Sequence, residues 1–436
     1  MATATGRPKV VIVGAGFGGL SALKTLGNKA VDVLLVDRNN YHGFWPLLYQ
    51  VATGQLDSAS IAYPIRGLIH AYKNADFQLA DVSGVDFAGK QVQIENGAPI
   101  PYDYLILAAG SAQFYFGNDA LAETTFSMKD VDQAEELRNH VIAAFEKAQT
   151  ETDPEKRKQL MTVAIVGGGP TGVELAGAYV ELFKYNFKRD FPSLDMSQAR
   201  VILIEAMGNI MLPFSDPAIK GPSPLQKSTA KVLEDRGVEI MLNAAVDSVA
   251  NNVVNFKDGR TLAAGTVIWA AGVRGAMLGD KLGLTLQRGA RVQVNEELNL
   301  PEHPDVFVVG DMAYLEGFKW GDRVMAYPQV AQVAVQMAKQ AAENIMVIAA
   351  GGQPSKFKYN DKGSMAIIGR NAAIVSASKP IPMKMGTRWG TFFPGWVMWL
   401  VVHVMFLQGW RNRFVSIFNW MFNWMNKDRG VRVMTG

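Results

Sequence analysis

The sequence predicts an α/β fold with two Rossmann-like dinucleotide-binding domains, the second inserted in the first, plus a C-terminal membrane-associating region. Three observations lead to this prediction. Residues 163–205 read as strand, glycine-rich turn, helix, strand and terminal acid, and residues 10–37 are a near copy of that pattern. The strand-like run 306–311 follows the inserted copy and has no counterpart within it. We therefore assign that run back to the first domain, which is split in the chain.

The first glycine-rich turn, Gly-Ala-Gly-Phe-Gly-Gly, follows the strand-like run 10–13. In such a Gly-x-Gly-x-x-Gly turn, the first glycine permits the bend, the second lets N–H groups approach a pyrophosphate, and the third lets helix and strand pack closely. Asp37 ends the next strand, where a carboxylate can accept hydrogen bonds from ribose hydroxyls. The expected ligand contacts of this turn are Gly14, Ala15, Gly16, Phe17, Gly18 and Gly19.

Residues 39–54 follow that acid and are apolar and aromatic, with breaks at Pro46 and at glycines. They read either as a buried loop or as a loop that packs on a flat cofactor ring. We expect the cofactor loop, because ligands bind at the carboxyl ends of the strands in such sheets. The buried strand expected at 104–110 ends in Ala109 and Gly110, which permit close approach of a ligand.

Further elements are expected from periodicity and turn residues. Before the inserted domain these are a helix over 61–72, strands over 77–87 and 90–95, a helix over 131–150 and a solvated linker over 151–158. Later in the chain they are a helix over 221–237, strands over 239–242, 253–256 and 267–272, and three short strand-like runs within 357–378.

The second glycine-rich turn, Gly-Gly-Gly-Pro-Thr-Gly, covers residues 167–172. Glu205 ends the following strand, and its charge would repel a 2′-phosphate while its oxygens bind a 2′-hydroxyl, which favours NADH over NADPH. The strand 267–272 repeats the Ala-Ala-Gly ending of 104–110. The expected NADH contacts are Gly167, Gly169, Gly172, Glu205, Ala271 and Gly272.

Two dinucleotide sites in one chain suggest that electrons pass between them. A dinucleotide that relays electrons is usually a tightly held flavin, so the split domain is expected to hold FAD and the inserted domain NADH. Glu174 lies in the expected first helical turn after the second glycine motif, either as a charge stabilised by the helix dipole or as a group that orients substrate or handles a proton. We expect the second role.

Asp311 directly follows the strand-like run 306–310, where it can accept hydrogen bonds from a sugar or ribityl chain. Residues 326–336 then lead into a helix that is expected to reach about residue 350. Pro328 at the start of this helix would point Gln332 toward the same cofactor edge, because a helix N-terminus favours oxygen-rich groups.

Composition excludes several kinds of chemistry. The 436 residues carry a net charge of only +3 and include no cysteine. Nucleic-acid binding is therefore not indicated, and disulfides, thiolate metal sites and thiol-based redox steps are excluded. Five scattered histidines lack metal-ligand spacing. No signal-peptide pattern precedes residue 10 and no apolar run reaches about 20 residues, so we expect neither a secretory peptide nor a membrane span.

The C-terminal region is rich in tryptophan. Five of the nine tryptophans lie between Trp396 and Trp424, in a segment that contains the mostly apolar runs 396–407 and 414–426. Indole rings favour the headgroup region of a bilayer and arginines favour anionic lipid, so we expect helices that lie on a membrane. The alternative is an apolar helix docked on the protein's own core or on a partner subunit. The expected domains are 1–155 with 286–352 for FAD, 156–285 for NADH, and 353–436 as the C-terminal region.

Nearly end to end, the chain resembles the type II NADH dehydrogenases, which are single-subunit NADH:quinone oxidoreductases. The resemblance rests on Val-Gly-Ala-Gly-Phe-Gly-Gly19, Asn-Tyr-His-x-Phe-x-Pro-Leu-Leu-Tyr-Gln-Val-Ala-Thr-Gly54, Gly-Gly-Gly-Pro-Thr-Gly-Val-Glu174, Trp-Ala-Ala-Gly-Val-Arg274, Val-Gly-Asp311, Ala-Gln332 and Phe-Leu-x-Gly-Trp-Arg-Asn-Arg413. The match is least regular around Lys379. Only the tail and the Ala-Gln segment separate this family from other flavin reductases.

The resemblance implies roles for particular residues. The FAD pyrophosphate would lie on residues 14–18, and the remaining FAD contacts would be Asn39, Asn40, Val82, Asp311, Ala331 and Lys379. Glu174 would match the family's functional glutamate, and Gln332 the glutamine of the quinone pocket. The implied enzyme is a non-pumping respiratory NADH:quinone oxidoreductase. It would be a peripheral homodimer. The cytoplasmic face of the cell membrane is expected only because no signal-peptide pattern was found.

Other classes share parts of this pattern. Sulfide:quinone oxidoreductases and disulfide reductases have the same architecture but need cysteines. An NAD(P)H-dependent ferredoxin or rubredoxin reductase would have no use for the tryptophan-rich tail. A non-enzymatic redox sensor that binds flavin and NADH would not turn over a quinone rapidly.

Overall fold

The computed structural model describes residues 6–377, 383–386 and 392–434. Contacts divide these residues into two compact units. The first unit consists of residues 6–42, 63–114 and 273–361, and the second of residues 43–62, 115–272 and the described residues from 362 onward. Each unit contains its own parallel sheet.

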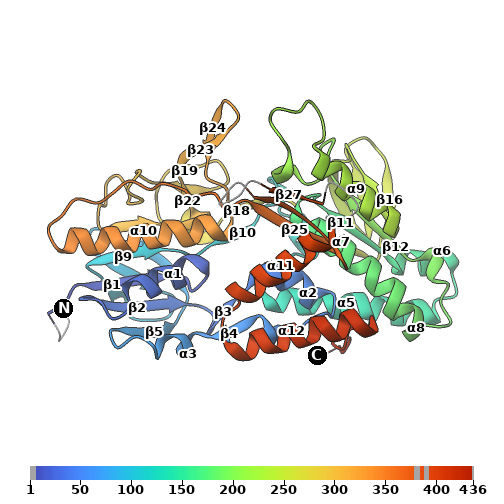
Figure 1. Ribbon diagram of the computed structural model, residues 1–436, viewed down its shortest axis with the longest axis horizontal. Coiled ribbons are helices and arrows are strands. Elements are labelled where there is room, and N and C mark those ends of the chain that lie inside the picture. The colour runs from blue at the N-terminus through green and yellow to red at the C-terminus, as the bar shows by residue number, and fades with distance from the viewer. Residues whose placement is uncertain (1–5, 378–382, 387–391, 435–436) are drawn as a thin grey trace. The chain divides into compact units, whose positions relative to one another are not determined.

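The first unit is built on a five-stranded parallel sheet in the order β21-β9-β1-β2-β5. Its strands are β1 (Lys9–Val13), β2 (Asp32–Asp37), β5 (Ala75–Leu79), β9 (Tyr104–Leu107) and β21 (Val306–Val308). They are rich in buried β-branched and aliphatic residues, as both faces of a parallel sheet require. Helices α1 (Phe17–Leu26) and α10 (Ala331–Ala349) pack against each other beside it (Figure 1).

The second unit is built on a four-stranded parallel sheet in the order β13-β12-β11-β17. Its strands are β11 (Thr162–Val166), β12 (Arg200–Ile204), β13 (Val238–Met241) and β17 (Thr266–Trp269). All five residues of β11 are buried, because it lies between β12 and β17 and is covered by α7 (Pro170–Glu181). The two sheets confirm the α/β class, and the return of β21 to the first sheet confirms that the second domain is inserted in the first.

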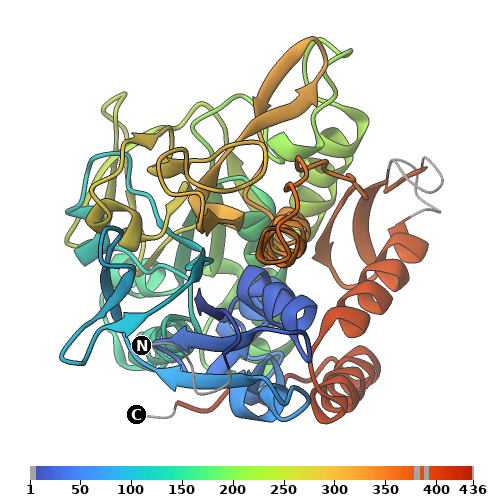
Figure 2. The same ribbon diagram turned by 90° about the vertical axis from the view of Figure 1, so that its left-hand side faces the viewer.

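The C-terminal part of the chain belongs to the second unit. Strands β25 (Ser364–Gly369), β26 (Ala372–Ala377) and β27 (Met383–Met385) form an antiparallel sheet. Helix α7 packs against β25, and α11 (Phe392–Phe406) packs against β26. Helices α11 and α12 (Trp410–Asn426) lie side by side (Figure 2, red). The residues after α12 fold back toward α7, where Arg429 donates to the Ala178 carbonyl oxygen.

The remaining elements complete the two units. In the first unit they are α3 (Ile65–Ile69), β6 (Val82–Asp86), β7 (Gln91–Ile94), β8 (Ile100–Pro101), β10 (Ser111–Gln113), β18 (Val273–Gly275), η6 (Met277–Lys281), β19 (Leu286–Gln287), β20 (Arg291–Gln293), η7 (Gly310–Met312), β22 (Ala313–Tyr314), β23 (Glu316–Trp320) and β24 (Arg323–Ala326). In the second unit they are η1 (Trp45–Leu47), α2 (Leu48–Ala52), η2 (Ser58–Ser60), α4 (Leu121–Thr124), α5 (Val131–Thr150), α6 (Pro154–Leu160), the π-helix η3 (Leu182–Phe187), α8 (Lys188–Asp190), η4 (Met196–Gln198), η5 (Leu212–Phe214), α9 (Pro224–Arg236), β14 (Val246–Ala250), β15 (Val253–Phe256) and β16 (Thr261–Ala263). Along the sequence, the chain passes from the first unit to the second within β3 (Tyr41–Gly43) and returns within β4 (Ala62–Pro64).

Four local expectations were wrong. Residues 39–54 are not a plain loop, because they contain the buried helix α2. The helix expected over 61–72 is reduced to α3 and preceded by β4, and the strand expected over 77–87 is split into β5 and β6. Residues 151–158, expected as a solvated linker, overlap helix α6, which begins at Pro154. Asp153 is the N-cap of this helix, and its side chain accepts a hydrogen bond from the N–H of Glu155. An aspartate at this position favours the start of a helix, and this signal was overlooked because the whole segment is highly charged.

The division by contacts differs from the domain bounds expected from the sequence. The second unit begins at residue 115 rather than 156, because α5 packs on α2 and β17. It also takes in residues 43–62 and the C-terminal region, which was expected to stand apart. The assignment of FAD to one unit and NADH to the other stays a prediction.

Candidate active site

The glycine-rich turn of the first unit is held by a carboxylate. The Gly14 N–H donates to the Val36 carbonyl oxygen at 2.8 Å. The Ala15 N–H donates to Asp37 Oδ2 at 2.6 Å, and the Asn39 N–H donates to Oδ1 at 2.7 Å. Asp37 therefore braces the turn itself, which the sequence did not predict. Each of its oxygens keeps a further lone pair, so its contact with a ribose stays a prediction.

The turn of the second unit repeats this arrangement bond for bond. The Gly167 N–H donates to the Ile204 carbonyl oxygen at 2.8 Å. The Gly168 N–H donates to Glu205 Oε2 at 2.8 Å, and the Met207 N–H donates to Oε1 at 2.8 Å. The internal repeat seen in the sequence thus extends to the hydrogen bonds that shape both turns.

The surroundings of three glycines in the first turn differ, and so does the effect that a Cβ atom would have at each. Gly14 has a φ of +99°, and a Cβ there would overlap the Ala108 carbonyl oxygen. A Cβ on Gly19 would overlap the Gly14 carbonyl oxygen, which is the close approach of helix to strand. A Cβ on Gly16 would meet no protein atom within 4 Å. Packing therefore does not require glycine at 16, and the space above it is open to a ligand.

The second turn divides the same three roles. Gly167 has a φ of +118°, and a Cβ there would lie 2.7 Å from the Ala271 nitrogen. A Cβ on Gly172 would overlap the Gly167 carbonyl oxygen, whereas one on Gly169 would meet no protein atom within 4 Å. Ala271 thus lies at the base of this turn, and Gly272 follows it in the chain.

Each turn leads into a helix without a side-chain cap. Gly16 is the N-cap of α1 and Gly169 the N-cap of α7, and neither helix has an acidic residue in its first turn. The first amides of a helix have no intrahelical acceptor and carry partial positive charge. The open space beside each N-cap therefore suits a pyrophosphate.

The other predicted residues of the first unit gather at the carboxyl edge of its sheet. Parallel strands β1, β2, β9 and β21 all end at this edge. A Cβ on Gly310 would lie 2.9 Å from the Ala334 Cβ, so the first turn of α10 packs over η7. The residues placed at this edge or at the start of α10 are Phe17, Gly18, Asn39, Asn40, Ala109, Gly110, Asp311, Ala331 and Gln332, while Val82 begins β6.

The first unit fits a dinucleotide at this edge. Besides the open space at Gly16, His42 is buried next to the turn, with Nδ1 2.8 Å from the Ala15 carbonyl oxygen. Burial lowers the pKa of His42, so its ring is neutral and Nδ1–H is the donor. Its Nε2 atom is buried and has no hydrogen-bond partner among the described residues. Buried polar groups normally have partners, so this acceptor suits a ligand hydroxyl or amide.

Glu174 is the fifth residue of α7 and so lies beyond its first turn, not within it as expected. Burial raises the pKa of its carboxyl to about 8, and the 3.4 Å bond from the Ile367 N–H opposes this only weakly. Attraction to the helix dipole would lower the pKa instead. Glu174 is therefore mostly neutral at pH 7 and carries a proton.

Glu174 lines a pocket formed within the second unit. The pocket has an empty volume of about 700 Å³ including its open mouth. Its walls come from α2, α7, η3, β25, α11, α12 and the segment after α12. The apolar and aromatic lining residues are Tyr49, Tyr185, Ile367, Trp396, Leu400, Trp420 and Trp424. The polar lining residues are Gln50, Gln55, Glu174, Glu181, Asn186, Arg370, Asn423, Lys427 and Arg429. The aromatic side chains suit a flat ring, and the polar groups can form hydrogen bonds with its oxygens.

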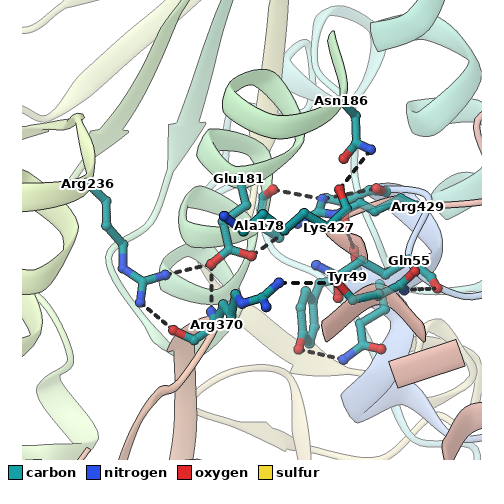
Figure 3. Close-up of polar contacts among 12 residues, drawn as sticks. Tyr49, Gln55, Ala178, Glu181, Asn186, Arg236, Arg370, Lys427 and Arg429 are labelled. Atoms are coloured by element: carbon teal, nitrogen blue, oxygen red, sulfur yellow. Dashed lines mark hydrogen bonds and ion pairs between the residues drawn. The ribbon is translucent and has the colours of Figure 1, made fainter. Parts of the chain in front are cut away.

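The charged lining residue Glu181 contacts Arg370 and Arg429, which also line the pocket, through polar interactions (Figure 3). Glu181 Oε1 accepts from Arg236 Nη1 at 2.6 Å and from the Arg370 N–H at 2.6 Å. Its Oε2 lies 3.3 Å from Arg429 Nη2. Burial lowers the pKa of Arg429 to about 10, so it stays charged at pH 7 and ties the C-terminal segment to α7.

Sequence reasoning missed most of this pocket. Glu181 lies seven residues after Glu174 and so on the same helix face, which is the signal that could have found it. Tyr49 and Gln50 were noted only as part of an apolar segment, and nothing local marked Arg429 as buried. Lys379, which was expected beside the flavin, lies outside the described residues. Glu174 belongs to the second unit and Gln332 to the first.

Two absences hold for the described part of the chain. It contains no group of three or more histidine or acidic side chains able to hold a metal ion. None of its helices is both long and apolar enough to cross a membrane.

The two matching turns and the pocket define a class of protein, the two-dinucleotide oxidoreductases. The family model for pyridine nucleotide-disulphide oxidoreductases matches residues 8–338. A structure of NDH2 from Plasmodium falciparum in complex with NADH shares the fold, with a TM-score of 0.84, 21% identity and coverage of 97% of this chain and 99% of that chain. The cysteine-free sequence excludes a disulfide-based reaction.

Curated relatives define the family more narrowly. The type II NADH:quinone oxidoreductase Ndh of Mycobacterium tuberculosis is 39% identical, over 98% of this chain and 90% of its own length. The type II NADH:quinone oxidoreductase of Staphylococcus haemolyticus is 30% identical, over 84% and 89% respectively. This chain belongs to the type II NADH:quinone oxidoreductases. The resemblance found in the sequence is confirmed.

Proposed function

We propose that this protein oxidises NADH and reduces a membrane quinone to quinol, with FAD held in the first unit. The observation that carries the proposal is the pair of matching turns, each leading into a helix N-terminus without a side-chain cap, together with a pocket that contains a neutral carboxyl. When bound, FAD accepts the hydride of NADH as an electron pair and passes electrons to the quinone. Steady-state NADH oxidation with a short-chain quinone or with ferredoxin as acceptor separates this activity from that of a ferredoxin reductase.

The residues of the first unit that would hold FAD have distinct tasks. The N-terminal amides of α1 beside Gly16 would bind the pyrophosphate, and Asp37 keeps those amides in place. Asp311 would accept hydrogen bonds from the ribityl chain, and the amides at the start of α10 would face the ring. Val82 would contact the adenine through its backbone, and Asn39 and Asn40 would lie near the pyrophosphate.

The second unit would bind NADH at the N-terminus of α7. The Glu205 side chain accepts hydrogen bonds from the Gly168 and Met207 N–H groups and so lies next to the turn. A 2′-phosphate there would be repelled, so NADH is preferred over NADPH. The substrate contacts proposed here are Gly167, Gly169, Gly172, Glu205, Ala271 and Gly272.

The quinone would occupy the pocket beside Glu174. Reduction of a quinone by NADH consumes one proton from solvent for each quinol that forms. Glu174 carries a proton at pH 7 and faces the pocket, so it can deliver that proton to a quinone oxygen. Gln332, at the start of α10 in the first unit, is the second residue proposed to act on the quinone.

We also propose that α11 and α12 lie on the membrane surface. One side of each helix docks on the second unit, where Trp399 and Ser416 are buried. The other sides expose an apolar surface made of Phe393, Val397, Val401, Met405, Phe406, Trp410, Phe414, Ile417, Phe418, Met421, Phe422, Trp424 and Met425. Large apolar side chains exposed in this number on two neighbouring helices indicate an interaction surface.

The double substitution Phe414→Glu and Phe418→Glu is expected to reduce binding to anionic phospholipid vesicles at least tenfold. Both rings are more than 60% exposed, so their loss removes lipid contacts without opening the core. Cosedimentation with vesicles measures this, with Val324→Glu on strand β24 as the control. Unchanged binding would contradict the membrane role, and a fall in the mass of the particle in solution would assign the surface to a second copy.

The homodimer is proposed from the family resemblance. Turnover is expected to be non-electrogenic, because a pump needs ionisable groups on spanning helices. Proteoliposomes with a trapped pH dye measure this during NADH oxidation. Proton translocation coupled to turnover would contradict the proposal.

A further inference from the structure

A chain of hydrogen bonds links membrane-facing helix α12 to the pocket that contains Glu174. The Trp420 indole N–H donates to Gln50 Oε1 at 2.7 Å. Gln50 Nε2 donates to the Tyr49 hydroxyl oxygen at 2.7 Å. Tyr49, Gln50 and Trp420 all line the pocket, and Tyr49 and Gln50 are otherwise buried.

The chemistry of the three groups fixes the direction of this chain. An indole N–H can only donate, so the Gln50 atom that meets it must be the amide oxygen. The amide nitrogen must then face Tyr49, and the tyrosine oxygen must accept. The hydroxyl hydrogen of Tyr49 is therefore left for another acceptor, and the described residues provide none. A buried hydroxyl normally finds an acceptor, which points to a ligand or water in the pocket.

The neighbours of Tyr49 make its hydroxyl a donor at any physiological pH. The charged or titratable groups that act on it are Glu174 and Glu181 from α7 and Arg429 from the C-terminal segment. Burial first and Glu174 second raise the pKa of Tyr49. By contrast, Tyr179 on α7 already donates its hydroxyl to the Ala52 carbonyl oxygen at 3.1 Å.

We propose that Tyr49 donates a hydrogen bond to a carbonyl oxygen of the quinone, and that Trp420 sets the direction of this bond through Gln50. The inference rests on the proposed function. NADH is oxidised and gives an electron pair and one proton, Glu174 gives the second proton, and both quinone C=O groups become C–OH. Tyr49 keeps its own proton and orients the carbonyl for protonation, and Trp420 is a positioning residue.

Tyr49→Phe is expected to lower kcat/KM for a short-chain ubiquinone analogue about tenfold, the usual effect of one lost hydrogen bond to a substrate. Flavin reduction by NADH should stay within twofold of the wild-type rate. Trp420→Phe should give a smaller loss of the same kind, because the Gln50 amide can then turn and take up the tyrosine hydroxyl hydrogen. The double variant should lose no more than Tyr49→Phe alone. Tyr72→Phe and Trp320→Phe are matched controls outside the pocket.

The possible results of these experiments separate the proposed role of Tyr49 from the proposed function. Wild-type kcat/KM for the quinone in Tyr49→Phe would overturn the proposal, and so would losses that add fully in the double variant. Equal losses in the NADH and quinone half-reactions would also overturn it, because they would indicate a general structural effect. If the wild-type protein itself fails to reduce the analogue after its flavin is reduced, the proposed function fails instead.

Discussion

Gly169→Ala is expected to raise the KM for NADH at least about tenfold while leaving the melting temperature unchanged. Gly169 has a φ of −74°, which alanine adopts readily, and its Cβ would meet no protein atom. The methyl group would instead fill the space beside the first amides of α7. Steady-state kinetics and a thermal melt measure the two effects. An unchanged KM would place the NADH pyrophosphate elsewhere.

The matched control is Gly172→Ala, three residues along the same turn. Its Cβ would overlap the Gly167 carbonyl oxygen, so it should destabilise the second unit by on the order of 2 kcal/mol. In the first unit Gly16→Ala should leave folding intact and lower the FAD content of the purified protein. If Gly16→Ala and Gly169→Ala destabilise the protein as Gly172→Ala does, the glycines of both turns are required for packing and not for ligand binding.

Glu174→Gln is expected to lower quinone turnover about 100-fold, because an amide cannot deliver a proton. Flavin reduction by NADH should be unaffected. In the wild-type protein, quinone turnover should fall as pH rises through about 8, the raised pKa of Glu174, and the variant should lack this step. Turnover measured from pH 6 to pH 9.5 tests both points, with the exposed Glu155→Gln on α6 as control. Wild-type rates in Glu174→Gln would contradict the role.

The same carboxyl links stability to pH. The folded-state pKa of Glu174 is about 8, above the model value of 4.5, so the folded protein holds a proton that the unfolded chain loses between these values. Stability from this group is therefore full below about pH 4.5 and falls as pH rises toward 8. Glu174→Gln should be more stable than wild type at pH 9 by about 1 kcal/mol or more. Equal melting temperatures at pH 9 would contradict this.

Local motifs predicted the sheet-forming parts of this molecule well. The runs 10–37 and 163–205 give both glycine turns and the acid that ends each second strand, because each feature depends on residues close in sequence. The hydrogen bonds from these acids to the turns were not predicted. The helix over 131–150 is α5 to the residue. The return of 306–311 to the first sheet followed from the repeat, since that run has no counterpart in the inserted copy.

The pocket could not be predicted in the same way. It joins Tyr49, Glu174 and Trp420, which are separated by more than 100 residues at each step, and no local pattern encodes that proximity. The pKa of Glu174 depends on burial by these distant segments rather than on its place in α7. No local pattern marked Arg429 as buried, whereas the folded-back C-terminal segment buries it against α7.

The most direct test of the central claim is stopped-flow absorbance of the purified protein in detergent. Flavin absorbance is followed after mixing with NADH, and a short-chain quinone is then added. The account predicts rapid bleaching with NADH but not with NADPH, followed by rapid recovery of the absorbance with the quinone. Bleaching by NADH without recovery would contradict quinone reduction and would make a protein such as ferredoxin the acceptor.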